Sequence, residues 1–172
     1  LHYTPLNVSP SFPIAAIYMN TAPNPTSPWV MPGSYQMSFS VDGMVRGSQD
    51  LIIKMDPRVK TSLKDLQLQH DLSLQAYINR KQILQIIDEI SILKTRTKNQ
   101  ASLDSLNKIQ NATRGSQEIS FSQLNGSFGS LMDILQDSDM PPTTQMISAM
   151  REANINFQKL LQRWTEVKKK LK

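Results

Sequence analysis

The chain has 172 residues, of which 39% are hydrophobic, and it carries a formal net charge of +5 with no cysteine. A chain of this length can bury about 70% of its unfolded surface, and the lack of cysteine excludes disulfides, thiolate nucleophiles and cysteine-ligated metal centres. No stretch approaches the roughly 18 apolar residues of a membrane span, and no signal segment opens the chain. Because Leu1 is not an initiator methionine, we expect a fragment or a processed product.

Prolines punctuate residues 1–33, where a helix is therefore not expected. Between them, the run from Phe12 to Met19 is the only good candidate for a strand. With the hairpin that follows, this gives about four strands, whereas an immunoglobulin-like sandwich needs about seven. We therefore expect either half a sandwich or a sheet that something else completes, because an open sheet edge is a liability.

A hairpin is predicted next. Large side chains alternate with polar ones from Tyr35 to Val41, Asp42-Gly43 is a turn dipeptide, and a second apolar run covers Leu51 to Met55. Asp56-Pro57 closes this strand, because proline has no backbone donor and disfavours the helical region in the residue before it.

From Thr61 the hydrophobic period becomes helical. Thr61 or Ser62 is placed to cap a helix of about 35 residues that reaches Thr97 without glycine or proline. Asp65 is placed to complete a capping box with that residue. The expected stripe on this helix is Leu63, Leu66, His70, Leu74, Tyr77, Leu84, Ile87 and Ser91, broadened by Ile78, Ile83, Ile86, Ile90 and Ile92.

Three shorter patterns complete the chain. They predict helices over Ser102 to Thr113, over Ser120 to Leu135 and from Thr143 or Thr144 to Leu171, with a break at residues 137–142. The fold class is therefore α+β: a small antiparallel β-sandwich-like head (residues 1–57), followed by a bundle of three or four helices (residues 58–172), two of them long and antiparallel.

Basic charge is concentrated in the last helix, at Lys159, Arg163, Lys168, Lys169, Lys170 and Lys172. Cations at a helix C-terminus complement its macrodipole. Since aromatic residues do not alternate with these lysines, the pattern favours a solvated helix end and no nucleic-acid partner.

Few residues offer catalytic or metal-binding chemistry, and the candidates are His2, His70, Asp88, Glu89, Asp137 and Asp139. His70 falls on the apolar stripe, which favours a packed histidine over a general base. Neighbouring helical carboxylates point about 100° apart, and two aspartates in a short break do not make a calcium loop. We therefore assign no catalytic, cofactor-binding or metal-binding residue, and no cofactor.

Three separated blocks carry a resemblance to a known family. They are TAPNPTSPWVMPGSYQMSFSVDG from Thr21 to Gly43, IKMDPRVKTSLKDLQLQHDLS from Ile53 to Ser73, and LNGSFGSLMDILQDSDMPPTTQM from Leu124 to Met146. Together with Trp164 in the last helix, they resemble the C-terminal region of secreted sortilin-like BNR-repeat propeller proteins, often labelled glycosyl hydrolases. The chain departs from that pattern at residues 44–50.

The resemblance implies a non-catalytic, exported accessory module that docks on or stabilises an upstream propeller domain of the same polypeptide. The parent protein would be the possible glycosyl hydrolase, and none of the family's catalytic positions falls in this chain. The alternative is a stand-alone helical domain that binds a protein partner through an apolar stripe too wide for its own bundle to cover, as the face from Ile83 to Ile92 suggests.

Overall fold

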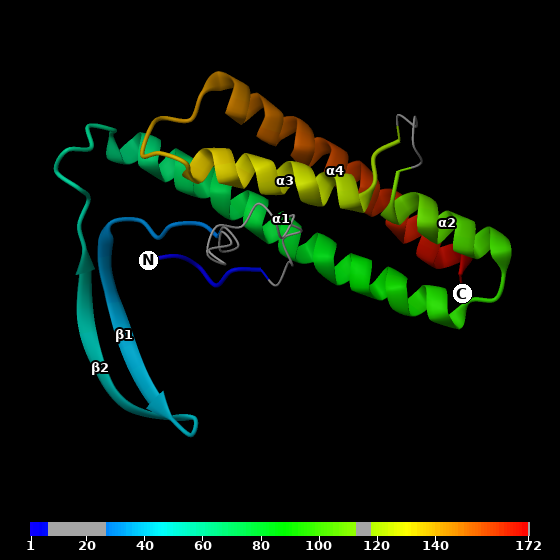
Figure 1. Ribbon diagram of the computed structural model, residues 1–172, viewed down its shortest axis with the longest axis horizontal. Coiled ribbons are helices and arrows are strands. Elements are labelled where there is room, and N and C mark those ends of the chain that lie inside the picture. Colours follow the sequence, from blue (N-terminus) through cyan, green and yellow to red (C-terminus); the bar gives the residue numbers. More distant parts are fainter. Residues whose placement is uncertain (7–26, 113–117, 172) are drawn as a thin grey trace, which may run out of the picture.

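The computed structural model describes residues 1–6, 27–112 and 118–171. Within these, a two-stranded sheet precedes four helices (Figure 1), which confirms the α+β class with a helical bundle. The elements are β1 (Gly33–Val41), β2 (Met44–Ile53), α1 (Leu63–Arg96), α2 (Gln100–Gln110), α3 (Phe121–Gln136) and α4 (Thr144–Lys170). The strand expected at residues 12–19 lies outside the described residues.

β1 and β2 form an antiparallel hairpin around the predicted turn. Asp42 and Gly43 both have positive φ, 51° and 78°, as a two-residue type I′ turn requires. Because this turn pairs the chain directly after Gly43, β2 begins at Met44, not at Leu51 as the apolar run had indicated. The register shifts after Phe39 and leaves Arg46 as an extra residue in β2.

Each helix begins at a capping side chain. Ser62 caps α1 and Thr143 caps α4, each being one of the two candidates that the sequence offered, Ser120 caps α3, and Asn99 caps α2. The side chain of Asp65 accepts a 2.6 Å hydrogen bond from the hydroxyl of Ser62.

The two long helices run in the same direction, which corrects the antiparallel arrangement expected from the sequence (Figure 1). Asn79 of α1 pairs with Asn154 of α4, and Glu89 further along α1 pairs with Lys168 further along α4. The physical reason is that α2 and α3 together make the return pass. The bundle therefore has three passes, the middle one being divided into two helices.

The core lies between these passes. Edge-to-face ring pairs join α3 to α4, with centroids 5.9 Å apart for Phe128 and Phe157 and 6.4 Å apart for Phe121 and Trp164. The buried residues of α1 are Leu66, Gln69, Ser73, Ala76, Asn79, Ile83, Ile86 and Ile90. The main stripe predicted for α1 is therefore wrong: the buried residues lie about one position earlier in the sequence. The reason is that the first half of α1 buries small and polar side chains, which a search for hydrophobic periodicity does not detect.

Candidate functional site

One face of the hairpin is apolar and exposed. Residues that share a face of an antiparallel pair alternate along each strand and lie opposite each other. We call this surface the apolar hairpin face, and it consists of Tyr35, Met37, Phe39 and Val41 from β1 with Met44 and Leu51 from β2. Phe39 is 65% exposed and Met37 57%. The hairpin projects away from the bundle (Figure 1), so none of the four described helices covers this face.

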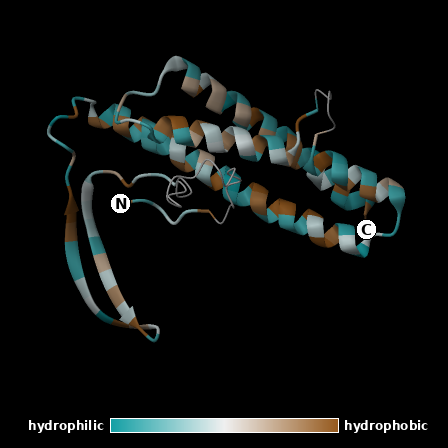
Figure 2. Ribbon diagram, in the orientation of Figure 1, coloured by the Kyte–Doolittle hydropathy of each residue, from teal (hydrophilic) through white to brown (hydrophobic). Residues whose placement is uncertain are grey.

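The opposite face is mostly polar, with Ser34, Gln36, Ser38 and Ser40 along β1. β1 has no charged residue, and β2 has one of each sign, Arg46 and Asp50. Figure 2 shows hydrophobic colour recurring along the hairpin, far from the packed interior of the bundle. The two strands therefore combine exposed apolar surface with no net charge, and the turn adds the carboxylate of Asp42.

A hollow interrupts the apolar hairpin face at Gly47. This glycine lies opposite Phe39, and a Cβ placed on it would meet no atom within 4 Å. The surrounding hollow has a volume of about 370 Å³ and is lined by Met37, Phe39 and Gly47 together with their neighbours in the strands. The hollow is open to solvent beside the Phe39 ring.

The first residues of the chain are paired with the segment that leads into β1. Val30 donates its backbone N–H to the carbonyl of Leu1 at 3.0 Å, and Tyr3 donates to the carbonyl of Pro28 at 2.9 Å. These bonds form an antiparallel bridge between His2 and Trp29, whose rings stack with centroids 3.6 Å apart. The N-terminal end therefore lies beside the start of β1.

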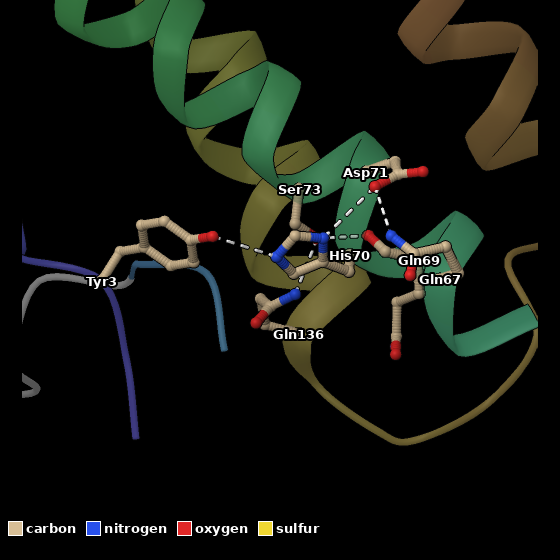
Figure 3. Close-up of polar contacts among 7 residues, drawn as sticks. All are labelled: Tyr3, Gln67, Gln69, His70, Asp71, Ser73 and Gln136. Carbon is tan, nitrogen blue, oxygen red and sulfur yellow. Dashed lines mark hydrogen bonds and ion pairs between the residues drawn. The ribbon is translucent and has the colours of Figure 1, made fainter. Parts of the chain in front are cut away.

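His70 belongs to a hydrogen-bonded group with Tyr3, Asp71 and Gln67 (Figure 3). Its Nε2 lies 3.3 Å from the Tyr3 hydroxyl, and its Nδ1 lies 3.3 Å from Oδ1 of Asp71, which accepts a 2.7 Å bond from Gln67. The His70 side chain is only 13% exposed. Both histidine contacts are at the long end of hydrogen-bond range, and the low exposure of the ring agrees with the packed histidine predicted from the sequence.

Two amide side chains, the buried Gln69 and the half-buried Gln136, connect the hairpin base to the bundle. Figure 3 shows Gln136 bonded to Ser73. Gln136 accepts from the Trp29 backbone N–H at 2.8 Å and donates to the Ser73 hydroxyl at 2.6 Å. Ser73 in turn donates to the carbonyl of Gln69, and the Gln69 amide donates to the carbonyls of Leu135 and Ser138. We call the connected residues Trp29, Gln69, Ser73 and Gln136 the polar anchor. It was not predicted from the sequence, because hydropathy alone does not identify glutamines that form bonds between elements.

The space beside the polar anchor is too small for a substrate. The cavity between the hairpin base and α1 has a volume of about 40 Å³, enough for one or two waters, whereas ligand pockets measure about 300–1,000 Å³. An open groove of about 660 Å³ between α3 and α4 is lined by small residues together with Ile119, Leu124 and Leu131, and its ionisable residues are Glu118 and Glu152.

The remaining sequence candidates are dispersed. Asp137 caps the end of α3, and Glu89 pairs with Lys168 at 3.4 Å. The described residues hold no group of three metal-ligating side chains. Glu118, which joins Lys108 and Arg163, has its pKa lowered chiefly by the hydrogen bond to Lys108. These two ion pairs link α2 to α4 through the carboxylate of Glu118, which also borders the groove between α3 and α4.

The isoleucine face proposed for partner binding is mostly internal. Ile83 and Ile90 are fully buried, and Ile86 is 7% exposed, whereas Ile92 is 51% exposed. The bundle therefore uses most of this face itself, and the exposed isoleucines on α1 stand singly.

Comparison with protein-family models, curated proteins and solved structures finds no match to this chain. The resemblance to BNR-repeat propeller proteins therefore rests on the three sequence blocks alone. Across the residues that the structure describes, no helix has the length and apolar character needed to cross a membrane.

Proposed function

We propose that this chain is a non-catalytic docking module. The helical bundle acts as a platform, and the apolar hairpin face packs on a β-sheet of another domain. On the strength of the sequence resemblance, we place that domain in the same exported polypeptide, at or beside an upstream BNR-repeat propeller. The observation that carries the proposal is the exposed apolar hairpin face, held at its base by the polar anchor.

The stability of the hairpin itself favours a partner that covers its apolar face. An isolated two-stranded hairpin is marginally stable in water, and additional strands or a packed face are needed for independent stability. Covering one large apolar side chain is worth about 1.5–3 kcal/mol, and both Met37 and Phe39 are more than half exposed. A partner that covers this face would therefore stabilise the hairpin as well as bind it.

The distribution of charge favours a protein sheet over a polyanion as the partner. The apolar hairpin face bears no charged side chain. The cluster of Lys168, Lys169 and Lys170 lies at the end of α4, remote from the hairpin in Figure 1. Lys168 and Lys169 also pair with glutamates. Electrostatic attraction of this cluster to nucleic acid or anionic lipid would therefore act at the end of α4 and not at the apolar hairpin face.

Photo-crosslinking in the full natural polypeptide tests this proposal. A benzophenone amino acid replaces Phe39, and a matched variant carries it at Ile155, which is 49% exposed on α4. We expect the probe at position 39 to crosslink to a β-strand outside the 172 residues, and the probe at position 155 not to do so. Crosslinking at position 39 that does not exceed the control, or that reaches only helices, would overturn the proposal.

A second variant tests whether a partner side chain enters the hollow at Gly47. Gly47→Val adds a β-branched residue where no atom lies within 4 Å, so the hairpin itself should tolerate it. If a partner side chain enters this hollow, Gly47→Val reduces crosslinking at position 39 while leaving the thermal unfolding of the bundle unchanged.

A further inference from the structure

We infer that the free edge of β1, and not that of β2, receives an antiparallel third strand that enters alongside Leu1. The inference deepens the proposed function and rests on it, because it names the part of the partner sheet that lies beside the hairpin. Its occupant is an extended, uncharged strand with alternating apolar and polar residues, continuous with the N-terminal side of Leu1 in the complete polypeptide.

The bridge at the hairpin base sets the direction. Residues 1–3 run antiparallel to residues 28–30 through the bonds from Val30 to Leu1 and from Tyr3 to Pro28. A strand that continues this pairing beyond Leu1 passes Met31 and Pro32 and then follows β1. In Figure 1 the N-terminus lies beside the start of β1, on the side away from β2.

The two edges of the hairpin differ in how well each could accept a third strand. β1 pairs over nine residues, has no charged side chain and contributes no extra residue to the bulge. The edge of β2 is interrupted by the bulged Arg46 and also carries Asp50. Bulges and charged side chains are the features by which proteins block strand addition at an edge. The regular and uncharged edge is therefore that of β1.

The side-chain pattern of β1 determines which kind of residue the third strand must carry on each face of the sheet. Tyr35, Met37, Phe39 and Val41 alternate with serine or glutamine along β1. Because neighbouring strands place opposing residues on the same face, alternating apolar residues in the third strand extend the apolar hairpin face. A shift of one residue would place them on the polar face instead.

A designed extension of the chain tests the inference. Nine residues alternating threonine and valine, matching the length of β1, are joined to Leu1 through two further residues so that they span Gly33 to Val41 in the register of the bridge. Amide hydrogen exchange is then measured by NMR. Only alternate residues of β1 direct their N–H groups away from β2. We expect exchange at these amides to slow at least tenfold, with the outward amides of β2 unchanged.

Two control extensions have nearly the same composition. One carries proline at two central positions, which removes ladder donors, and one has a single residue inserted before Leu1, which reverses the side-chain faces. Neither should slow exchange in β1 as the first extension does. Unchanged exchange with the designed strand, or slowing in β2 instead, would overturn the inference. The proposed function fails separately, through the crosslinking at Phe39, which does not depend on the edge used.

Discussion

The backbone N–H of Trp29 donates a 2.8 Å hydrogen bond to Oε1 of Gln136, which is 107 positions further along the chain. This bond joins the entrance of the hairpin to the last turn of α3. Since Gln136 also donates to Ser73 of α1, one side chain connects the hairpin base to two helices. The orientation of the apolar hairpin face therefore depends on this glutamine.

Replacing Gln136 should loosen the hairpin base. Gln136→Ala removes both bonds and leaves the Ser73 hydroxyl, whose residue is fully buried, without its donor, so we expect a loss of about 1–3 kcal/mol in the free energy of unfolding. Gln136→Glu keeps the acceptor for Trp29 and loses the donor to Ser73. Chemical denaturation measures the stability, and amide exchange at Trp29 reports the local bond. Ile134→Ala, at a half-exposed position on the same helix, is the control. Equal stability of Gln136→Ala and the control would show that the anchor is unimportant.

The two glycines of α3 should respond differently to alanine. A Cβ at Gly126 would meet no atom within 4 Å, whereas a Cβ at Gly129 would lie 3.3 Å from Cζ of Arg80. Gly126→Ala should stabilise the chain by about 0.8–1 kcal/mol, the difference in helix propensity. Gly129→Ala should gain less or destabilise, because the half-buried Arg80 guanidinium must move. Thermal denaturation measures the stability of both variants. An equal increase in stability would contradict the close contact between Gly129 and Arg80.

Stability should fall in acid partly through Glu118. The hydrogen bond from Lys108, supported by Arg163, holds the pKa of Glu118 below its ordinary value of 4.5. A carboxyl whose pKa is lower in the folded state stabilises the fold above the unfolded pKa, and this contribution is lost as the pH falls through the folded pKa. We therefore expect Glu118→Gln to lower the urea midpoint at neutral pH and to lower it less as the pH drops below about 4.5.

The matched control for Glu118 is Glu152→Gln, at an exposed glutamate on α4. The difference between the two variants in midpoint against pH isolates the ion pair of Glu118 with Lys108 and Arg163. A Glu118→Gln curve parallel to that of the unmodified chain throughout the acid range would contradict its role.

The apolar hairpin face should be removable without harm to the bundle. In the isolated chain, Met37→Ser with Phe39→Ser should change the unfolding free energy of the bundle by less than about 0.5 kcal/mol, as exposed positions usually do. The same double variant should bind less of a fluorescent dye specific for apolar surface. Ile78→Ser, on the exposed side of α1, is the comparison. Destabilisation of the bundle by the hairpin variant would mean that this face packs internally.

Local signals account for most of what the sequence predicted about the fold. Asp42-Gly43 specified the turn, and the capping residues specified the starts of α1 and α4 to within one position, because each acts on neighbouring backbone groups. The direction of α4 relative to α1 was not predictable in this way. It depends on how α2 and α3 divide the return pass, which is a property of tertiary packing.

The candidate site was partly predictable. The alternation from Tyr35 to Val41 identified a strand with one apolar face, but only the structure shows that this face is exposed. The polar anchor was not predictable, because Gln69, Ser73 and Gln136 have side chains typical of a solvated surface. Gln69 and Ser73 are nevertheless buried and Gln136 is half-buried, because their hydrogen bonds join segments far apart in the sequence.

The most direct test of the docking proposal is amide hydrogen exchange in the hairpin, compared between the isolated chain and the complete natural polypeptide. If the hairpin needs a partner sheet, the amides of β1 exchange far faster than those of α1 in the isolated chain and become as protected as those of α1 in the complete polypeptide. Amides of β1 that are already as protected as α1 in the isolated monomer would contradict the account, because the hairpin would then be complete without a partner.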